Sequence, residues 1–177
     1  MGHVYEVVLI GGGNLLLRGI ISRPTKDGDL LGELGPGRQI IRIEHLPEPL
    51  ARAVRDIATT YGLKDDWLNL GPRSMLDHPL PIGFAARLER VPYGDGLVVW
   101  FAGLYDQVCF KLHAAADAYP LRDRHIDDLA KLDPTRADLI TAAQWTLTHD
   151  GSPGYRFLLI ETLKRLGIDD ADDVIGR

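Results

Sequence analysis

A run of glycines followed closely by two aspartates constrains this sequence most, in the stretch VVLIGGGNLLLRGIISRPTKDGDLL at residues 7–31. Residues 4–10 are rich in β-branched side chains and predict a buried strand. The glycines at 11–13 end that strand, and residues 14–20 predict a short helix. A strand that turns through glycines into a helix presents backbone N–H groups and the positive end of a helix dipole. The start of the chain therefore predicts a phosphate-binding turn.

Two carboxylates follow on what is predicted to be a second strand, residues 25–31, because Pro24 ends the helix. Side chains alternate along a strand, so Asp27 and Asp29 are expected to project from the same face. Mg²⁺ prefers oxygen ligands and is commonly held by one or two carboxylates together with substrate phosphates. If the two strands lie side by side, a triphosphate and its metal meet at one place. The pattern then indicates metal-assisted phosphoryl or nucleotidyl transfer.

The same glycines do not fit two common nucleotide-binding motifs. Leu16 occupies the third glycine position of G-x-G-x-x-G, which disfavours a dinucleotide-binding fold. No G-K-S/T follows the glycines, which argues against a P-loop. The interpretation therefore depends on the glycines and the acidic pair together.

The rest of the chain divides into strands and then helices. Residues 85–91 and 97–104 predict an antiparallel hairpin, because two strand-like segments flank a short turn. Residues 47–61 begin at a proline and have apolar residues with a 3.6-residue period, which predicts an amphipathic helix. Four further helices are predicted after the hairpin, at residues 105–118, 124–132, 134–149 and 153–166.

This order predicts a single α+β domain over residues 1–177, with a mixed-sheet core at 1–104 and a helical region at 105–177 packed on it. The single cysteine, Cys109, excludes an internal disulfide, so a cytoplasmic location is expected. No apolar run approaches the roughly 20 residues that span a membrane, so no membrane partner is expected. The net charge of −5 weighs against a broad nucleic-acid surface.

The glycine turn and the acidic pair together resemble the nucleotidyltransferase superfamily typified by DNA polymerase beta. In that superfamily a strand, a Gly-Gly or Gly-Ser turn and a helix precede a D-x-D strand. The closer similarity is to the small bacterial nucleotidyltransferase-like proteins of toxin–antitoxin and abortive-infection systems, which carry GG…R-x-T-x-D-x-D. Two later stretches, FKLHAAAD at 110–117 and RHIDDLAKLDPT at 124–135, resemble that group's downstream helices, and the resemblance covers residues 5–150. The matching motif residues are Gly11, Gly12, Arg23, Thr25, Asp27 and Asp29.

The resemblance implies a nucleotidyltransferase fold and a role for each matching residue. Asp27 and Asp29 would hold Mg²⁺, and Lys111 would neutralise charge that develops on the phosphates. Lys111 lies beside an apolar stripe, and a lysine in such a place is expected to extend its amine to solvent. The residues implied to hold the nucleoside triphosphate are Gly11, Gly12, Gly13, Asn14, Arg23 and Thr25.

The function that the resemblance implies is transfer of a nucleotidyl group from a nucleoside triphosphate to a hydroxyl of transfer RNA or protein. The chain would be the toxin of a toxin–antitoxin system, with an antitoxin as its partner. An alternative is a catalytically degenerate member that only binds a nucleotide or a protein partner.

The sequence offers several candidates for the third carboxylate of such a site and does not decide between them. The related proteins carry R-D-x-x-D, whereas here His125 stands in the place of the first acid and Asp128 keeps the second. The neighbouring Asp123 and Asp127 are further candidates. Glu89 is a rival from the predicted hairpin, since the wider superfamily has its third carboxylate on a later strand.

Overall fold

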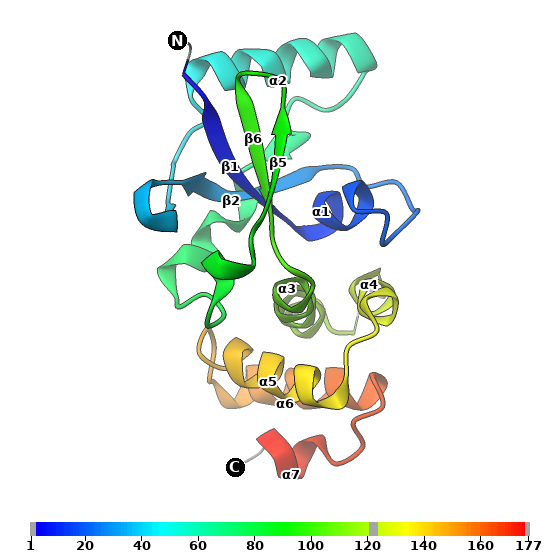
Figure 1. Cartoon of the computed structure of the whole chain (residues 1–177). Coiled ribbons are helices and arrows are strands. Elements are labelled where there is room, and N and C mark those ends of the chain that lie inside the picture. Colours follow the sequence, from blue (N-terminus) through cyan, green and yellow to red (C-terminus); the bar gives the residue numbers. More distant parts are fainter. Residues whose placement is uncertain (1–2, 121–123, 176–177) are drawn as a thin grey trace. The chain divides into compact units, whose positions relative to one another are not determined.

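The computed structural model describes residues 3–120 and 124–175, and it is a mixed α/β structure (Figure 1). The chain forms two compact units, Met1–Gly103 and Leu104–Arg177. The first unit contains the sheet, and the second consists of helices. The division falls beside the boundary between residues 104 and 105 that separates predicted strands from predicted helices.

The described part of the N-terminal unit contains a six-stranded sheet, with the strands β1 (Tyr5–Ile10), β2 (Gly28–Leu34), β3 (Ile40–Ile41), β4 (Leu68–Asn69), β5 (Glu89–Tyr93) and β6 (Leu97–Phe101). Its order is β3-β2-β1-β6-β5, and β4 also pairs with β2. β1 is antiparallel to β2 and parallel to β6, which makes the sheet mixed. The predicted hairpin is confirmed, because β5 and β6 pair antiparallel.

Two α-helices, α1 (Gly11–Leu17) and α2 (Glu48–Tyr61), belong to this unit. The amphipathic helix predicted at residues 47–61 is confirmed, and Leu50 joins the apolar core of the sheet. That core consists of Val7, Leu9, Leu30, Leu50, Leu70 and Phe101. Short 3₁₀ helices η1 (Pro36–Arg38), η2 (Gly71–Asp77) and η3 (Phe84–Arg87) connect the other elements.

Two boundaries near the glycines differ from the prediction. The glycines form the first turn of α1 and do not make a separate loop before it. Gly11 has a φ of +73°, a left-handed value that glycine adopts without strain, so the chain passes directly from β1 into the helix. β2 begins at Gly28, so Asp27 lies just before the strand. The Thr25 hydroxyl donates to the carbonyl of Asp27 at 3.1 Å, which closes a turn there.

The C-terminal unit consists of α3 (Leu104–Asp117), α4 (Arg124–Leu132), α5 (Arg136–Thr146), α6 (Pro153–Arg165) and α7 (Ala171–Ile175). α3 packs against α4, α5 and α6 and is buried along most of its length. Capping explains two of the helix starts, since the hydroxyls of Thr135 and Ser152 accept from backbone N–H groups of the first turns of α5 and α6. None of the helices within residues 3–120 and 124–175 is long and apolar enough to cross a membrane.

Candidate functional site

The glycine turn and the acidic pair meet at one corner of the N-terminal unit. The register of β1 and β2 pairs Ile10 with Asp29, so the residue after Ile10 lies beside that aspartate. A Cβ placed on Gly11 would lie 2.5 Å from Oδ2 of Asp29, closer than any real contact. A larger residue at position 11 would have to displace this carboxylate, in addition to adopting a left-handed φ of +73°.

The other two glycines contact the residues that precede the carboxylates. A Cβ on Gly12 would lie 3.0 Å from the hydroxyl of Thr25 and 3.9 Å from a guanidinium nitrogen of Arg23. A Cβ on Gly13 would lie 3.3 Å from the Cα of Gly28. The first turn of α1 is thus packed closely against the segment that carries the R-x-T-x-D-x-D residues. α1 has only seven residues, so its helix dipole is a weaker feature of this corner than the close packing of its first turn.

Asp29 lies at this corner, and Asp27 lies two residues earlier, just before β2. Asp27 is exposed and Asp29 is half-buried. Across residues 3–120 and 124–175, there is no group of three or more His, Cys, Asp or Glu residues arranged to hold a metal ion. Two carboxylates nevertheless suit Mg²⁺, which takes its other ligands from substrate phosphates and water. The residues present therefore fit a metal that binds together with a polyphosphate.

Asn14, one of the predicted phosphate-binding residues, has a structural side chain. It is fully buried, and its amide donates to the carbonyls of Leu9 at 2.9 Å and Ala102 at 3.2 Å. These bonds attach α1 to the ends of β1 and β6. Any contact of Asn14 with phosphate would therefore come from its backbone.

Glu89 does not lie beside the aspartates. Its carboxylate pairs with Arg18 at 2.6 Å, and Arg18 also donates to the carbonyl of Ala102 at 3.0 Å. In the sheet order, β1 and β6 separate β5 from β2. Three strand spacings of about 4.8 Å place Glu89 roughly 14 Å from Asp29. That separation is too great for the two carboxylates to share one metal ion.

Lys111 and Asp128 form a buried ion pair within the helical unit. Nζ of Lys111 lies 2.7 Å from Oδ2 of Asp128, and the two side chains are only 7% and 1% exposed. The expectation that Lys111 extends to solvent is wrong, because a carboxylate on α4 compensates the buried amine on α3. Asp127, the next residue, is exposed. Asp123 lies outside the described residues.

Asn69 is a neighbour of Asp29 that sequence reasoning did not find. It lies on β4, opposite Asp29 in the register with β2, and its amide nitrogen is 3.5 Å from Oδ1 of Asp29. Its own oxygen accepts from the backbone N–H of Gly71 at 2.7 Å. The sequence Asn-Leu-Gly-Pro predicts such a turn, because an asparagine oxygen commonly accepts from the N–H two residues on. Nothing local in the sequence places the turn beside Asp29.

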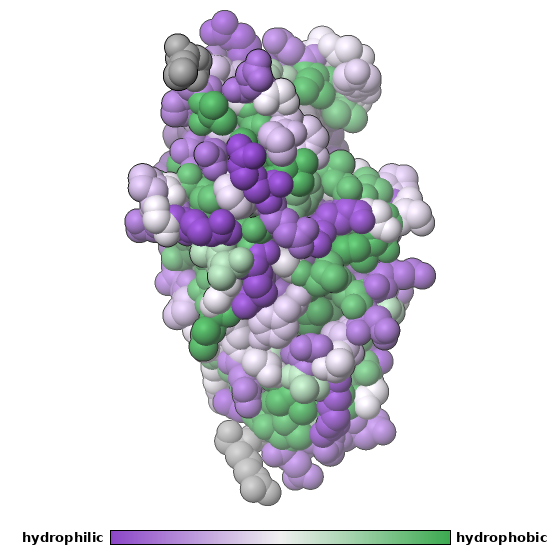
Figure 2. Space-filling model, viewed as in Figure 1, coloured by the Kyte–Doolittle hydropathy of each residue, from purple (hydrophilic) through white to green (hydrophobic). Residues whose placement is uncertain are grey.

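An apolar cavity of about 220 Å³ adjoins the same corner. Asp27 and Gly28 line it together with Leu16, Leu17 and Trp67. Leu17 is 63% exposed, and Figure 2 shows hydrophobic surface around α1. Polar groups beside an apolar cavity are the usual composition of a small-molecule site. A larger groove of about 610 Å³ lies around η3 and holds none of the predicted site residues, so we assign the site to the glycine–aspartate corner.

Comparisons with known proteins give no family. No family model, no curated protein and no solved structure matches this chain. The residues of the corner itself therefore carry the functional assignment.

Proposed function

We propose that this chain is a Mg²⁺-dependent nucleotidyltransferase with the nucleotidyltransferase fold. It would transfer a nucleotidyl group from a nucleoside triphosphate to a hydroxyl of transfer RNA or protein. The observation that carries the proposal is the contact between Gly11 and the carboxylate of Asp29. It puts the first residue of the expected phosphate-binding turn beside Asp29, one of the two expected metal ligands.

The roles follow from this arrangement. Asp27 and Asp29 would hold the Mg²⁺, which when bound neutralises phosphate charge and orients the phosphates for displacement. The first turn of α1 would face the phosphates, and Arg23 and Thr25, next to Gly12, would contact them. Arg18 is engaged with Glu89.

The sequence also predicts Lys111 and Asp128 as site residues, and both lie on the helical unit. The proposal gives Asp128 the task of holding the Lys111 amine, since the two groups are 2.7 Å apart and buried. The pair is already neutralised within the helical unit, so its first expected task is to stabilise that unit. The resemblance to toxin–antitoxin proteins supports a toxin role in the cytoplasm, with an antitoxin as partner.

A second candidate is a member that binds nucleotide without transferring it. The observation in its favour is that two candidates for the third carboxylate, Glu89 and Asp128, are engaged in other ion pairs. Glu89 is paired with Arg18 and separated from Asp29 by two strands, and Asp128 is paired with Lys111. A site to which residues 3–120 and 124–175 contribute no third carboxylate could bind a Mg²⁺–triphosphate and lack the group that activates an acceptor hydroxyl.

The test is a labelling assay. The purified chain is incubated with Mg²⁺, transfer RNA, cell extract and each radiolabelled nucleoside triphosphate in turn. Wild type should incorporate label, and Asp27→Ala and Asp29→Ala should lose it. Asp66→Ala is the matched control, because Asp66 is an exposed aspartate in a turn of the same unit.

Three outcomes separate the candidates. Label that survives in both aspartate variants contradicts the proposed site. Triphosphate binding without any labelling favours the second candidate. If wild type neither labels an acceptor nor binds any triphosphate, both candidates fail.

A further inference from the structure

The start of β2 has a second strand beside it. β4 pairs parallel with β2, opposing Gly28 to Leu68 and Asp29 to Asn69. Paired residues on neighbouring strands have their side chains on the same face. The place beside Asp29 where a sheet could present a third carboxylate is therefore occupied by an amide.

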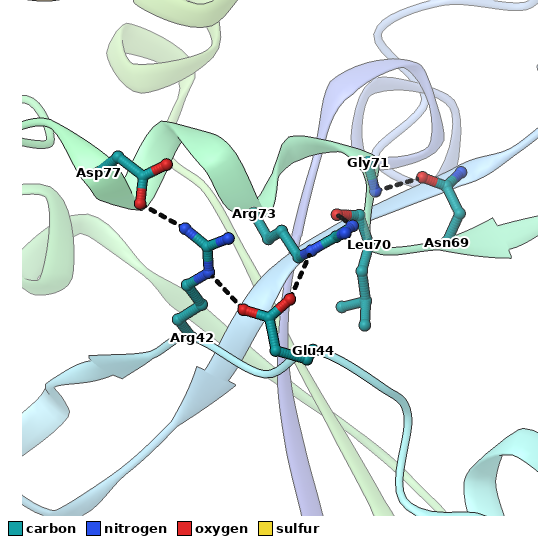
Figure 3. A network of polar contacts seen from close by, with 7 residues as sticks. All are labelled: Arg42, Glu44, Asn69, Leu70, Gly71, Arg73 and Asp77. Atoms are coloured by element: carbon teal, nitrogen blue, oxygen red, sulfur yellow. Dashed lines mark hydrogen bonds and ion pairs between the residues drawn. The ribbon is translucent and has the colours of Figure 1, made fainter.

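The orientation of this amide is determined by its surroundings. Oδ1 of Asn69 accepts from the N–H of Gly71 at 2.7 Å, so the oxygen must face that donor (Figure 3). Nδ2 then points the other way, and it lies 3.5 Å from both the Gly28 carbonyl and Oδ1 of Asp29. Because its oxygen faces the Gly71 N–H and its nitrogen faces Asp29, Asn69 acts toward Asp29 as a donor.

The corner that carries Asn69 is held by a polar network. Arg73, on η2, donates to the Leu70 carbonyl at 3.0 Å and to Glu44 at 3.2 Å. Arg42 joins the other oxygen of Glu44 at 2.7 Å and also pairs with Asp77 (Figure 3). The network therefore ties both ends of η2 to the segment after β3, and it keeps Asn69 in place next to β2.

We propose that Asn69 is a positioning residue for Asp29. Its amide holds one carboxylate oxygen, so that the other, Oδ2, stays against Gly11 at the turn. This inference rests on the proposed function, because it assigns Asn69 to the same metal–triphosphate site. In the proposed site, the residue opposite Asp29 on β4 is thus an uncharged donor and not a further carboxylate.

The contact itself is tested without any ligand. Unfolding free energies are measured for Asn69→Ala, Asp29→Ala and the double variant, in a double-mutant cycle. We expect the two substitutions to be non-additive, because each removes the same contact. Additive effects would overturn the inference. The cycle is independent of nucleotide binding, so it decides on the contact between Asn69 and Asp29 even if the proposed function fails.

The role in the site is tested by calorimetric titration with Mg²⁺ and each nucleoside triphosphate. Asn69→Ala should weaken binding on the order of tenfold, as the loss of an outer-shell partner of a metal ligand does. Gly71→Ala should weaken binding in the same direction, because its Cβ would lie 2.8 Å from Oδ1 of Asn69. Gly96→Ala is the control, since a Cβ there meets nothing within 4 Å.

The outcomes are distinct. If wild type binds and Asp29→Asn does not, but Asn69→Ala binds as tightly as wild type, the proposed function stands and the role of Asn69 falls. If Asn69→Ala and Gly71→Ala both weaken binding while Gly96→Ala does not, the positioning role is supported. Circular dichroism of each variant excludes loss of fold as the cause.

Discussion

The two units of this protein treat their charged side chains in opposite ways. In the sheet unit, the predicted metal ligands lie at an accessible corner, where Asp27 is exposed and Asp29 half-buried. In the helical unit, Lys111 and Asp128 are almost fully buried and neutralise each other at 2.7 Å. Both sets of residues are ones for which the sequence predicts a role in the site.

The difference predicts which charged side chains, when removed, lower the free energy of unfolding most. An exposed carboxylate is solvated, so its loss changes stability little and affects mainly what it binds. A buried ion is stable only while its partner is present, because desolvation of a lone charge is costly. We therefore expect substitutions at the sheet corner to affect ligand binding, and substitutions in the buried pair to affect folding first.

The largest expected effect is that of Lys111→Ala. The substitution leaves the 1%-exposed Asp128 carboxylate without its lysine, which should lower the free energy of unfolding by about 3–5 kcal/mol. Chemical denaturation followed by circular dichroism measures it. Lys164→Ala is the control, because Lys164 pairs with Asp172 at 2.6 Å in the same unit but on its surface, and its loss should change stability little.

A double variant sharpens this prediction. Lys111→Met with Asp128→Leu replaces the pair by apolar groups and should restore most of the lost stability. If it folds well but no longer labels an acceptor, the pair has a catalytic task beyond stability. A small loss in Lys111→Ala, equal to that in Lys164→Ala, would contradict the contrast between the two pairs.

Sequence reasoning predicted the elements that have a periodic pattern. The helix at 47–61, the hairpin and the helices around α3, α4 and α6 were all found near their predicted places. The meeting of Gly11 with Asp29 also follows from sequence, since two strands joined by a short helix commonly lie side by side.

The parts that sequence did not predict depend on distant partners. β4 has only two residues, too few for any period, and it exists because it pairs with β2 forty residues earlier. Asn69 reaches the site by that pairing alone. The burial of Lys111 likewise depends on Asp128, which lies on another helix. A local apolar pattern cannot show which charge faces it across the core.

Gly11→Ala should give the next largest effect, and Gly19→Ala is its matched control. Both glycines have a left-handed φ, +73° and +70°, so alanine costs about 1–2 kcal/mol of stability at either position. Nothing lies within 4 Å of a Cβ at Gly19, whereas at Gly11 it would collide with Asp29. Gly11→Ala should therefore also lose Mg²⁺–triphosphate binding. Equal binding by both variants in calorimetry would contradict the assignment of this corner as the site.

A smaller effect is expected at alkaline pH in the helical unit. Burial raises the pKa of Tyr155, whose hydroxyl lies 2.9 Å from Nδ1 of His113. The folded pKa lies above the unfolded value of about 10, so stability is unaffected below that pH and falls as pH rises above it, by about 1.4 kcal/mol per unit. Tyr155→Phe should flatten this alkaline decline. Tyr61→Phe, at a tyrosine that is 73% exposed in the sheet unit, should leave the decline unchanged.

The smallest expected effect is at acidic pH, in the network that holds the Asn69 corner. The hydrogen bond from Arg42 lowers the pKa of Glu44, with a further contribution from Arg73. A lowered folded pKa means that the stabilisation is present above the unfolded value of about 4.3 and is lost as pH falls through the folded one. Glu44→Gln should remove this acid sensitivity.

The dependence of stability on salt concentration should distinguish this exposed network from the buried pair. At roughly 1 M salt, where the Debye length is about 3 Å, the contribution of Glu44 should be screened and that of Lys111–Asp128 largely retained. Unfolding measured for Glu44→Gln and Lys111→Ala at low and high salt gives the comparison. If high salt removes the effect of Lys111→Ala as completely as that of Glu44→Gln, burial does not distinguish the two units.

Because the Glu44 network fixes η2, Mg²⁺–triphosphate binding should weaken with acid before the sheet unit unfolds.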